Sequence, residues 1–190
     1  MKKDEIRTAL ITGAAEGVGK AYARYFAEHG YRLIMVSKNI ERVQKYADML
    51  YRKYGSYIKV LQYDLSEPHS LSSLLPEVDC HKIDVLVNNA AEEFSDSTAH
   101  LSGIERKRLI EVQINTTVSL TLHVLRIMIN ENRGCIINLA AAPSKIFDPQ
   151  SSFCQSSCRM FICQFTEGLL PSLSGTGVFV QAVCPGLYRS

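Results

Sequence analysis

Three glycines near the start of the chain have the type and spacing of residues that bind a phosphate. They lie in the segment "TGAAEGVG", Thr12–Gly19, where Gly13, Gly17 and Gly19 allow a tight turn and a close approach of the backbone to a pyrophosphate. The segment follows a strand-like run and opens a helix-like one, so free N–H groups at the helix N-terminus would point at that phosphate. In this context the motif indicates a dinucleotide site; a glycine turn without a ligand is the less favoured alternative.

The segment "FCQSSCRMFICQFTEGL", Phe153–Leu169, is the second place where chemistry is expected. It has helical periodicity and holds three cysteines but no tyrosine. Cys154 and Cys158 are four residues apart and share a helix face, so a thiol beside Arg159 would have a lowered pKa and would be reactive. Packed, unreactive helix cysteines are the favoured interpretation. The cysteine spacing matches no metal site, and we expect no bound metal.

Short apolar runs alternate with amphipathic stretches, and this alternation predicts the elements that position both segments. Strands that are apolar throughout, each followed by a helix, indicate a parallel sheet covered on both faces. The predicted fold class is therefore α/β, a Rossmann-type doubly wound parallel sheet with about six strands, in a single dinucleotide-binding domain over residues 1–190. The expected strands are 8–12, 32–37, 57–62, 83–89, 134–140 and 177–186; the expected helices are 17–29, 40–54, 67–76 with a proline in its first turn, a long helix over 110–129, and 153–173.

Composition and charge exclude several classes of protein. Hydrophobic residues make up 46% and charged residues 21% of the chain, and the net charge of +2 is too small to indicate nucleic acid or a membrane surface as a partner. No apolar stretch approaches the length needed to cross a bilayer, and the N-terminal apolar run is too short for a signal peptide, so we expect a cytoplasmic protein. The six cysteines form no C-x-x-C pair and are expected to be mostly buried small hydrophobes.

Five motifs, in order and at matching spacing, resemble those of the short-chain dehydrogenase/reductase family over essentially the whole chain. The family's T-G-x-x-x-G-x-G pattern is met at Thr12–Gly19, its D-[VL], which contacts adenine, at Asp64–Leu65, and its N-N-A-G at Asn88–Ala91. Its helix asparagine, part of a proton relay, is matched by Asn115, and its P-G turn by Pro185–Gly186. The resemblance implies a nicotinamide cofactor and hydride transfer to or from a carbonyl or alcohol.

The catalytic positions depart from the family pattern. In the family a tyrosine gives or takes the proton, a lysine four residues later lowers the pKa of that tyrosine and holds the nicotinamide ribose, and a serine polarises the carbonyl. The resemblance places these three positions at Gln155, Arg159 and Ala141. Shifting the alignment by one or two residues supplies neither a tyrosine on the helix nor a serine after the fifth strand. The shifted alignments place Cys154 with Cys158, or Phe153 with Ser157, at the tyrosine and lysine positions, and Ala140 or Ala142 at the serine position.

The end of the second strand predicts the kind of dinucleotide. Family members that use NAD usually carry an aspartate there, whereas this chain offers Ser37 and Lys38. A lysine at this position would meet the 2′-phosphate of NADP; a solvated surface lysine is the alternative. Glu16 argues the other way, because its carboxylate would repel that phosphate unless it turns away. We therefore expect NADP more than NAD. The cofactor-binding residues implied by the resemblance are Gly13, Glu16, Gly17, Val18, Gly19, Ser37, Lys38, Asp64, Leu65, Asn89, Ala90, Ala91, Arg159, Pro185, Gly186 and Ser190.

Two functions are compatible with these departures. The first is a dinucleotide-binding pseudoenzyme, because Gln155 has no proton to give at neutral pH while the fork of Arg159 still bonds ribose hydroxyls. The alternative is an active NADP-dependent oxidoreductase in which water or a thiol supplies the proton. Eight of the nine tyrosines precede Asp64, and the ninth, Tyr188, follows the P-G turn and would need an unusual loop to reach the site.

The last expectations concern the end of the sequence and its partners. Family members continue past the P-G turn, whereas this sequence stops at Ser190, so we expect a sheet without the family's last strand and helix. The sixth strand would then be an apolar edge, covered by another chain or left by an incomplete gene product. In the family the fourth and fifth helices form a dimer interface, and one face of the long helix suits a homodimer; it carries Ile110, Ile114, Val118, Leu122, Leu125 and Ile129.

Overall fold

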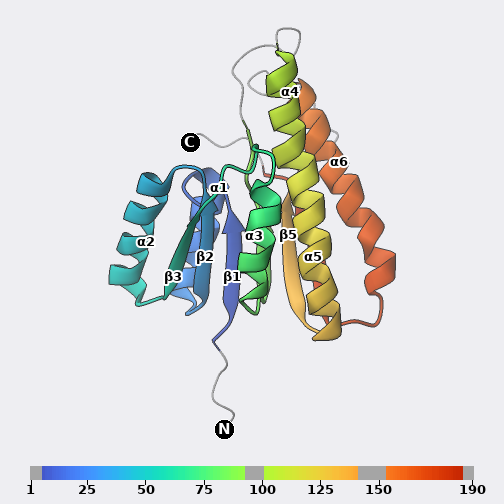
Figure 1. Cartoon of the computed structure of the whole chain (residues 1–190). Helices are drawn as coiled ribbons and strands as arrows, with labels where there is room; N and C mark the ends of the chain where they lie inside the picture. The colour runs from blue at the N-terminus through green and yellow to red at the C-terminus, as the bar shows by residue number, and fades with distance from the viewer. Residues whose placement is uncertain (1–5, 93–100, 141–152, 186–190) are drawn as a thin grey trace.

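The computed structural model describes residues 6–92, 101–140 and 153–185, and these form one six-stranded parallel sheet with flanking helices (Figure 1). The chain builds from β1 outward to β3 and then returns to β4 on the other side of β1, so the strand order reverses between β1 and β4. All neighbouring strands pair in parallel. In sheet order the strands are β3 (Ile58–Gln62), β2 (Arg32–Ser37), β1 (Thr8–Thr12), β4 (Val85–Asn88), β5 (Gly134–Leu139) and β6 (Val178–Val183).

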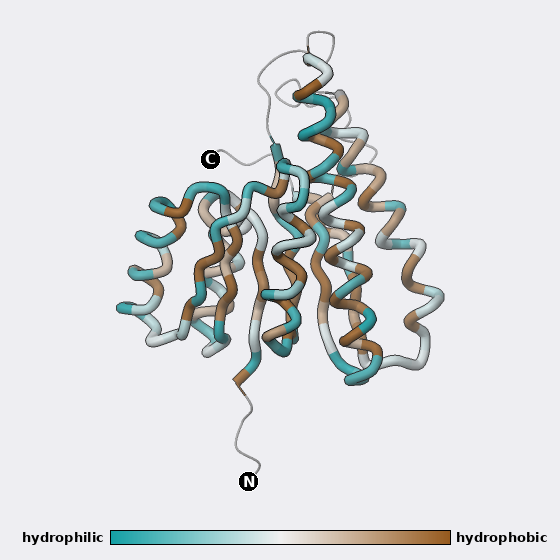
Figure 2. Tube along the Cα trace, viewed as in Figure 1, coloured by the Kyte–Doolittle hydropathy of each residue, from teal (hydrophilic) through white to brown (hydrophobic). Residues whose placement is uncertain are grey.

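Helices cover both faces of the sheet. The first face carries α1 (Gly17–Glu28) and α2 (Ile40–Tyr54), and the second carries α3 (Ser70–Asp79), α5 (Thr117–Asn130) and α6 (Phe153–Leu169). The strands between them are hydrophobic along most of their length (Figure 2). Because each buried leucine or isoleucine contributes about 1.5–3 kcal/mol, continuous apolar runs become the central strands of such a sheet. The fold class predicted from the sequence is confirmed.

Local signals set the ends of the helices. The Asn39 side chain accepts the backbone N–H of Arg42 at 3.0 Å and caps the start of α2, and Gly55 ends that helix with a left-handed φ of 71°. The predicted start of the short third helix is wrong. His69 has a φ of 71°, which no helix interior contains, so α3 begins at Ser70. Pro68, predicted to lie in the first turn, therefore precedes the helix, and a second proline, Pro76, lies inside it.

The long helix after β4 consists of three parts: α4 (Gly103–Ile110), a π-helical turn η2 (Glu111–Thr116) and α5. By length and composition the whole stretch Gly103–Asn130 could cross a membrane, so the expectation that no apolar stretch reaches this length was wrong. Half of the apolar window is buried in the protein, and Leu120 and Met128 belong to the core. The apolar residues of this stretch therefore include those with which a helix packs against the sheet.

The predicted apolar face of the long helix lies mostly on its outer side. Ile110, Leu122 and Ile129 are exposed, whereas Leu125 is buried and does not share their environment. The core is contacted instead by the opposite face, which includes Val112, Leu120, Val124 and Met128. Exposed apolar side chains therefore remain on the surface of α4 and α5.

Candidate functional site

The glycine-rich turn after β1 has the shape of a phosphate-binding loop. Gly13 and Gly17 have φ angles of +64° and +50°, which favour glycine. A Cβ on Gly13 would lie 2.8 Å from Asn89 Nδ2, and one on Gly19 would collide with the Asn89 side chain and the Gly13 carbonyl. Because α1 begins at Gly17, the unpaired N–H groups of its first turn lie at this loop. The residues present therefore fit a bound pyrophosphate.

Hydrogen bonds from the end of β4 hold the glycine-rich turn in place. Thr12 Oγ1 accepts the backbone N–H groups of Asn89 at 3.0 Å and Ala90 at 3.1 Å. The Asn89 side-chain amide donates to the Gly13 carbonyl at 2.9 Å. Asn89, predicted to contact the cofactor, thus also acts as a brace between β4 and the turn.

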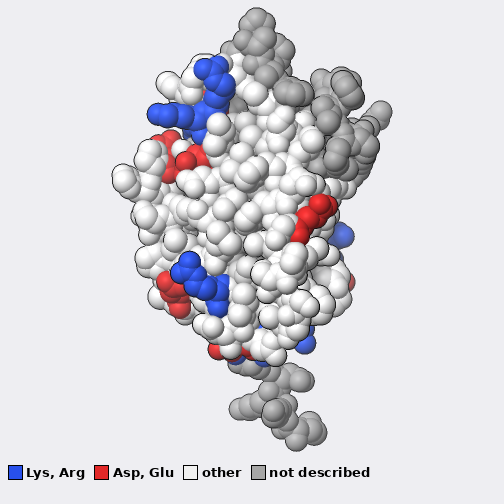
Figure 3. Space-filling model, turned by 90° about the vertical axis from the view of Figure 1, so that its right-hand side faces the viewer, with Lys and Arg blue, Asp and Glu red and all other residues white. Residues whose placement is uncertain are grey.

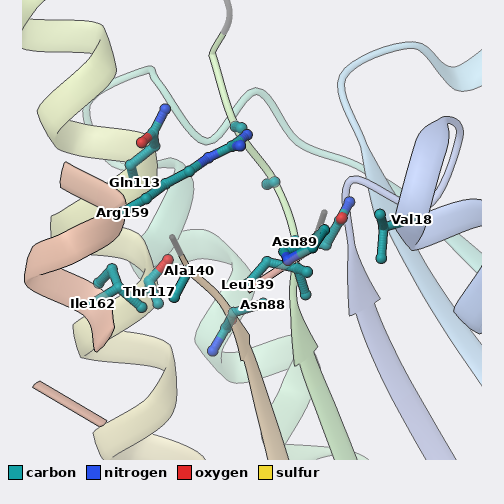
Figure 4. A pocket seen from close by; sticks show the side chains of 12 residues that line it. Val18, Asn88, Asn89, Gln113, Thr117, Leu139, Ala140, Arg159 and Ile162 are labelled. Atoms are coloured by element: carbon teal, nitrogen blue, oxygen red, sulfur yellow. The ribbon is translucent and has the colours of Figure 1, made fainter. Parts of the chain in front are cut away.

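A pocket lies at the carboxyl ends of β1, β4 and β5, beside the glycine-rich turn (Figure 4). The strand order reverses here, and doubly wound sheets bind their ligands at this point. Among the described lining residues, Arg159 carries the one charge and Thr117 the one hydroxyl. The lining residues are Val18, Asn88, Asn89, Ala90, Ala91, Gln113, Thr117, Leu139, Ala140, Arg159, Ile162 and Pro185.

Within the described part of the chain, two buried amide oxygens in this wall have no hydrogen-bond donor. Asn88 Oδ1 and Gln113 Oε1 have no hydrogen-bond partner among the described residues. A buried acceptor without a donor costs about 1–3 kcal/mol, so a ligand with suitable donors would relieve that cost. A nicotinamide dinucleotide carries ribose hydroxyls and a carboxamide N–H₂ group, and the pocket therefore fits it.

Gln155 and Arg159 come from α6, one helical turn apart. Gln155 is buried, and its Nε2 donates to the backbone carbonyl of Glu92 at 3.4 Å. Gln113 donates from η2 to the same carbonyl at 3.3 Å. Arg159 reaches from α6 across the pocket, and no hydrogen bond or ion pair joins it to another residue that the structure describes (Figure 4). As far as the described residues show, this wall therefore presents a positive charge without a paired carboxylate.

The α6 cysteines have raised rather than lowered pKa values where a shift is resolved. Burial raises the pKa of Cys158, and the neighbouring Cys154 raises it further. Burial also raises the pKa of Cys163. The lowered pKa expected beside Arg159 is therefore wrong for Cys158, because loss of water disfavours the thiolate. In the described parts of the chain, His, Cys, Asp and Glu form no group that could hold a metal ion.

Asp64 follows the end of β3, and its carboxylate already has hydrogen-bond and ion-pair partners within the protein. It accepts the backbone N–H of Ser66 at 3.0 Å and its hydroxyl at 2.6 Å, and it pairs with Arg108 at 3.2 Å. Burial alone would raise the pKa of Asp64, but the Ser66 hydrogen bonds and the charges of Lys38 and Arg108 hold it below the ordinary value. The next residue, Leu65, is buried in the core.

The cations beside the end of β2 are both paired. Ser37 is buried there, and its hydroxyl accepts a backbone N–H two residues on, at 3.2 Å. Lys38 Nζ lies 2.7 Å from Glu92 Oε1. Arg42, in the first turn of α2, pairs with Glu16. Glu16 therefore points toward a cation of the protein itself, and this ion pair is exposed.

Comparison with known proteins assigns this arrangement to a family. The family model described as short chain dehydrogenase matches residues 7–190. The chain belongs to the short-chain dehydrogenase family. The resemblance inferred from the motifs is thereby confirmed.

Similar short-chain dehydrogenases occur in animals and bacteria. The chain is 29% identical to 17-beta-hydroxysteroid dehydrogenase type 3 of Mus musculus over 180 residues, which cover 93% of this chain and 58% of that protein. It is 30% identical to oxidoreductase UcpA of Escherichia coli K12, covering 97% of this chain and 70% of that protein. The chain thus spans less than two thirds of the length of the steroid dehydrogenase.

Solved structures of short-chain dehydrogenases share the fold. One from Sphingobium yanoikuyae in complex with NADPH superposes with a TM-score of 0.89 at 28% identity, covering 97% of this chain and 72% of that one. A bulky-bulky ketone specific alcohol dehydrogenase from Comamonas testosteroni gives a TM-score of 0.87 at 28% identity, covering 95% and 72%. Neighbours of this kind bind nicotinamide dinucleotides.

Asn115 is not where the short-chain dehydrogenase pattern suggests. Its side chain is exposed on η2, where it donates to Glu111 at 2.7 Å and accepts from Ser119 at 3.4 Å. Gln113, two residues earlier, is buried in the pocket wall. The side chain of Asn115, which the motif match placed at the family's helix asparagine, is therefore not among the residues that line the pocket, whereas that of Gln113 is. Three other predicted site residues lie outside the described residues: Ala141, Gly186 and Ser190.

A buried polar network beneath the pocket was not predicted from the sequence. Asn138 Oδ1 accepts from Asn88 at 2.8 Å and from Thr121 at 3.2 Å, and Asn138 Nδ2 donates to Thr166 at 3.0 Å. Asn138 and Thr121 are fully buried. The network joins β4, β5, α5 and α6 directly below the carboxyl edge. Its only sequence signal was Asn138 itself, a polar residue inside an apolar strand.

Proposed function

We propose that this short-chain dehydrogenase binds NADP(H) in the crevice between β1 and β4, and that its oxidoreductase turnover is absent or very weak. The observation that supports weak turnover is the lining of the pocket, which among the described residues contains no tyrosine, serine or lysine. Thr117 brings an aliphatic hydroxyl, and the amides of Gln113 and Asn88 do not release protons at neutral pH. A site without a general acid loses about 10²–10⁴-fold in rate.

The chain's own residues would bind and orient the dinucleotide. The backbone N–H groups of the glycine-rich turn would hold the pyrophosphate, and Arg159 would donate hydrogen bonds to ribose hydroxyls or a phosphate. Gln113 Oε1 would accept a hydrogen bond from an N–H or O–H group of the ligand. The nicotinamide, when bound, supplies or accepts a hydride. Lys38, in place of the acidic residue that favours NAD, supports NADP.

An active enzyme that takes its proton from water or a thiol is the alternative. The raised pKa of Cys158 argues against a thiolate acting as base in alcohol oxidation. Water, or a thiol that stays protonated, remains the donor that this alternative needs. Relatives named as a hydroxysteroid dehydrogenase and a very-long-chain 3-oxoacyl-CoA reductase suggest bulky carbonyl compounds as the substrates to try.

The experiment that tests the proposal separates binding from turnover. Purified protein is titrated with NADPH while the cofactor's fluorescence is followed, and a panel of ketosteroids and 3-oxoacyl thioesters is then added while NADPH absorbance is followed. We expect saturable binding and no consumption above the rate without protein. Steady NADPH consumption with any member of the panel contradicts the loss of turnover, and absence of saturable binding contradicts the whole proposal.

We also propose a homodimer through the long helix and α6. Apolar side chains remain exposed on these elements, including Leu122, Ile129 and Phe161. The same side of the molecule shows a broad area with few charged residues (Figure 3). Sedimentation equilibrium is expected to give twice the chain mass; a species of one chain mass at micromolar concentration contradicts the dimer. The cytoplasmic location stays a prediction.

A further inference from the structure

The ion pair between Lys38 and Glu92 spans the carboxyl edge of the sheet. Lys38 follows β2 and Glu92 lies four residues past the end of β4, and these strands flank β1. The Nζ and Oε1 atoms lie 2.7 Å apart although the residues are 54 positions apart in the chain. The pair therefore links the segments that follow β2 and β4, on the two sides of β1.

The two partners differ in burial. The Glu92 side chain is 11% exposed, whereas that of Lys38 is 54% exposed. The Glu92 backbone is fixed as well, because its carbonyl accepts from both Gln113 and Gln155. A largely buried carboxylate needs a counter-charge, and in the described part of the chain Lys38 is the cation that pairs with it. Lys38 is therefore held by an internal anion.

This arrangement matters because of what the end of the second strand does in such folds. The residue there contacts the ribose 2′ position of the dinucleotide. A 2′-phosphate would have to compete with Glu92 for Lys38, and it would approach a carboxylate that stays in place. A 2′-hydroxyl would leave the ion pair intact. The second nearby cation, Arg42, is likewise paired, with Glu16.

We propose that Glu92 is a specificity-determining residue that lowers the affinity for NADP(H) relative to NAD(H) by holding Lys38. The inference rests on the proposed dinucleotide binding and concerns only the balance between the two cofactors. Lys38 would favour NADP(H) by binding its 2′-phosphate, whereas Glu92, which lies outside the glycine-rich turn, would disfavour NADP(H) by pairing with Lys38. Loss of the Glu92 charge would free Lys38 for the phosphate.

Equilibrium titrations with NADPH and with NADH, followed by cofactor fluorescence, test the proposal without any need for turnover. For Glu92→Gln we expect the affinity for NADPH to rise about tenfold and that for NADH to change less than about twofold. In the double variant Lys38→Met/Glu92→Gln the gain for NADPH is lost. The matched control is Glu77→Gln. Glu77, on α3, forms an ion pair of the same 2.7 Å length with Lys59, on β3. Loss of its carboxylate is expected to leave the affinities for NADPH and NADH unchanged.

Thermal unfolding of the protein without cofactor gives an independent measure of the pair. Lys38→Met is expected to lower the midpoint by leaving Glu92 unpaired, and adding Glu92→Gln is expected to restore part of it. If Glu92→Gln leaves the NADPH to NADH affinity ratio unchanged while both still bind, this inference is wrong and the proposed function stands. If neither dinucleotide binds the folded wild-type protein, the proposed function fails and the inference fails with it.

Discussion

The two halves of the crevice are built on opposite electrostatic principles. The glycine-turn half, at the ends of β1, β2 and β3, holds three cations, Lys38, Arg42 and Arg108, and each pairs with a carboxylate of the protein. The α6 half, at the ends of β4, β5 and β6, presents Arg159 with no such partner among the described residues, surrounded by amides and apolar side chains.

This difference indicates which interactions would attract a ligand in each half of the crevice. Where charges are already neutralised, a phosphate gains little from them, and the backbone N–H groups of the glycine-rich turn must supply the attraction. Where one cation is uncompensated, an incoming oxygen gains a charge-assisted hydrogen bond. The α6 half could thus contribute to binding without contributing a proton to catalysis.

The largest expected effect comes from adding a side chain in the glycine-rich turn. In Gly19→Ala the new methyl group would collide with Asn89 and the Gly13 carbonyl, so dinucleotide affinity should fall by at least about a hundredfold, or about 2.7 kcal/mol. Gly168→Ala on α6 is the control, because its Cβ would meet nothing within 4 Å and should stabilise the helix by about 0.5–1 kcal/mol. Calorimetric titration and urea unfolding measure both. Equal affinities for the two variants contradict the role of the turn.

The second effect concerns the network that supports the α6 half. Asn138→Ala removes three buried hydrogen bonds and leaves their partners unsatisfied, so the free energy of unfolding should fall by about 2–4 kcal/mol. Asn115→Ala is the matched control, since that amide is exposed, and should cost less than about 0.5 kcal/mol. Urea unfolding at fixed pH compares them. Similar losses would show that the network adds nothing beyond a surface amide.

The same contrast shows what the sequence could predict. Apolar runs gave the strands, because the inner strands of a covered parallel sheet are buried on both faces, and the glycine spacing located the turn, because few residues tolerate its φ angles. The pairing of Lys38 with Glu92 and the Asn138 network join residues far apart in the chain, and no local pattern encodes them. The π-helical turn was missed for a related reason: no local pattern distinguishes it from the α-helix on either side, and none showed that Gln113 rather than Asn115 lines the pocket.

A third effect tests the uncompensated charge itself. Arg159→Gln should weaken NADH binding about tenfold, because it replaces charge-assisted hydrogen bonds by neutral ones. Arg159→Lys keeps the charge and should recover part of the loss. Arg42→Gln, in the glycine-turn half, removes a cation that is already paired and should change NADH affinity less than about twofold. Fluorescence titration compares the three; an equal loss in Arg42→Gln and Arg159→Gln would remove the distinction between the halves.

The smallest effect is the pH dependence that Asp64 contributes to stability. Its pKa lies below the ordinary 3.8 in the folded protein, so its stabilising contribution is complete above that value and is lost as the pH falls through the lower folded pKa. Asp64→Asn should therefore reduce the free energy of unfolding by less than about 1 kcal/mol near neutral pH, since the group is partly exposed, and by progressively less in acid. Urea unfolding over a series of acidic buffers measures the difference between the two proteins. A difference that grows as the pH falls would mean that Arg108 and Ser66 do not stabilise the Asp64 carboxylate, and that the glycine-turn half is not internally neutralised at this position.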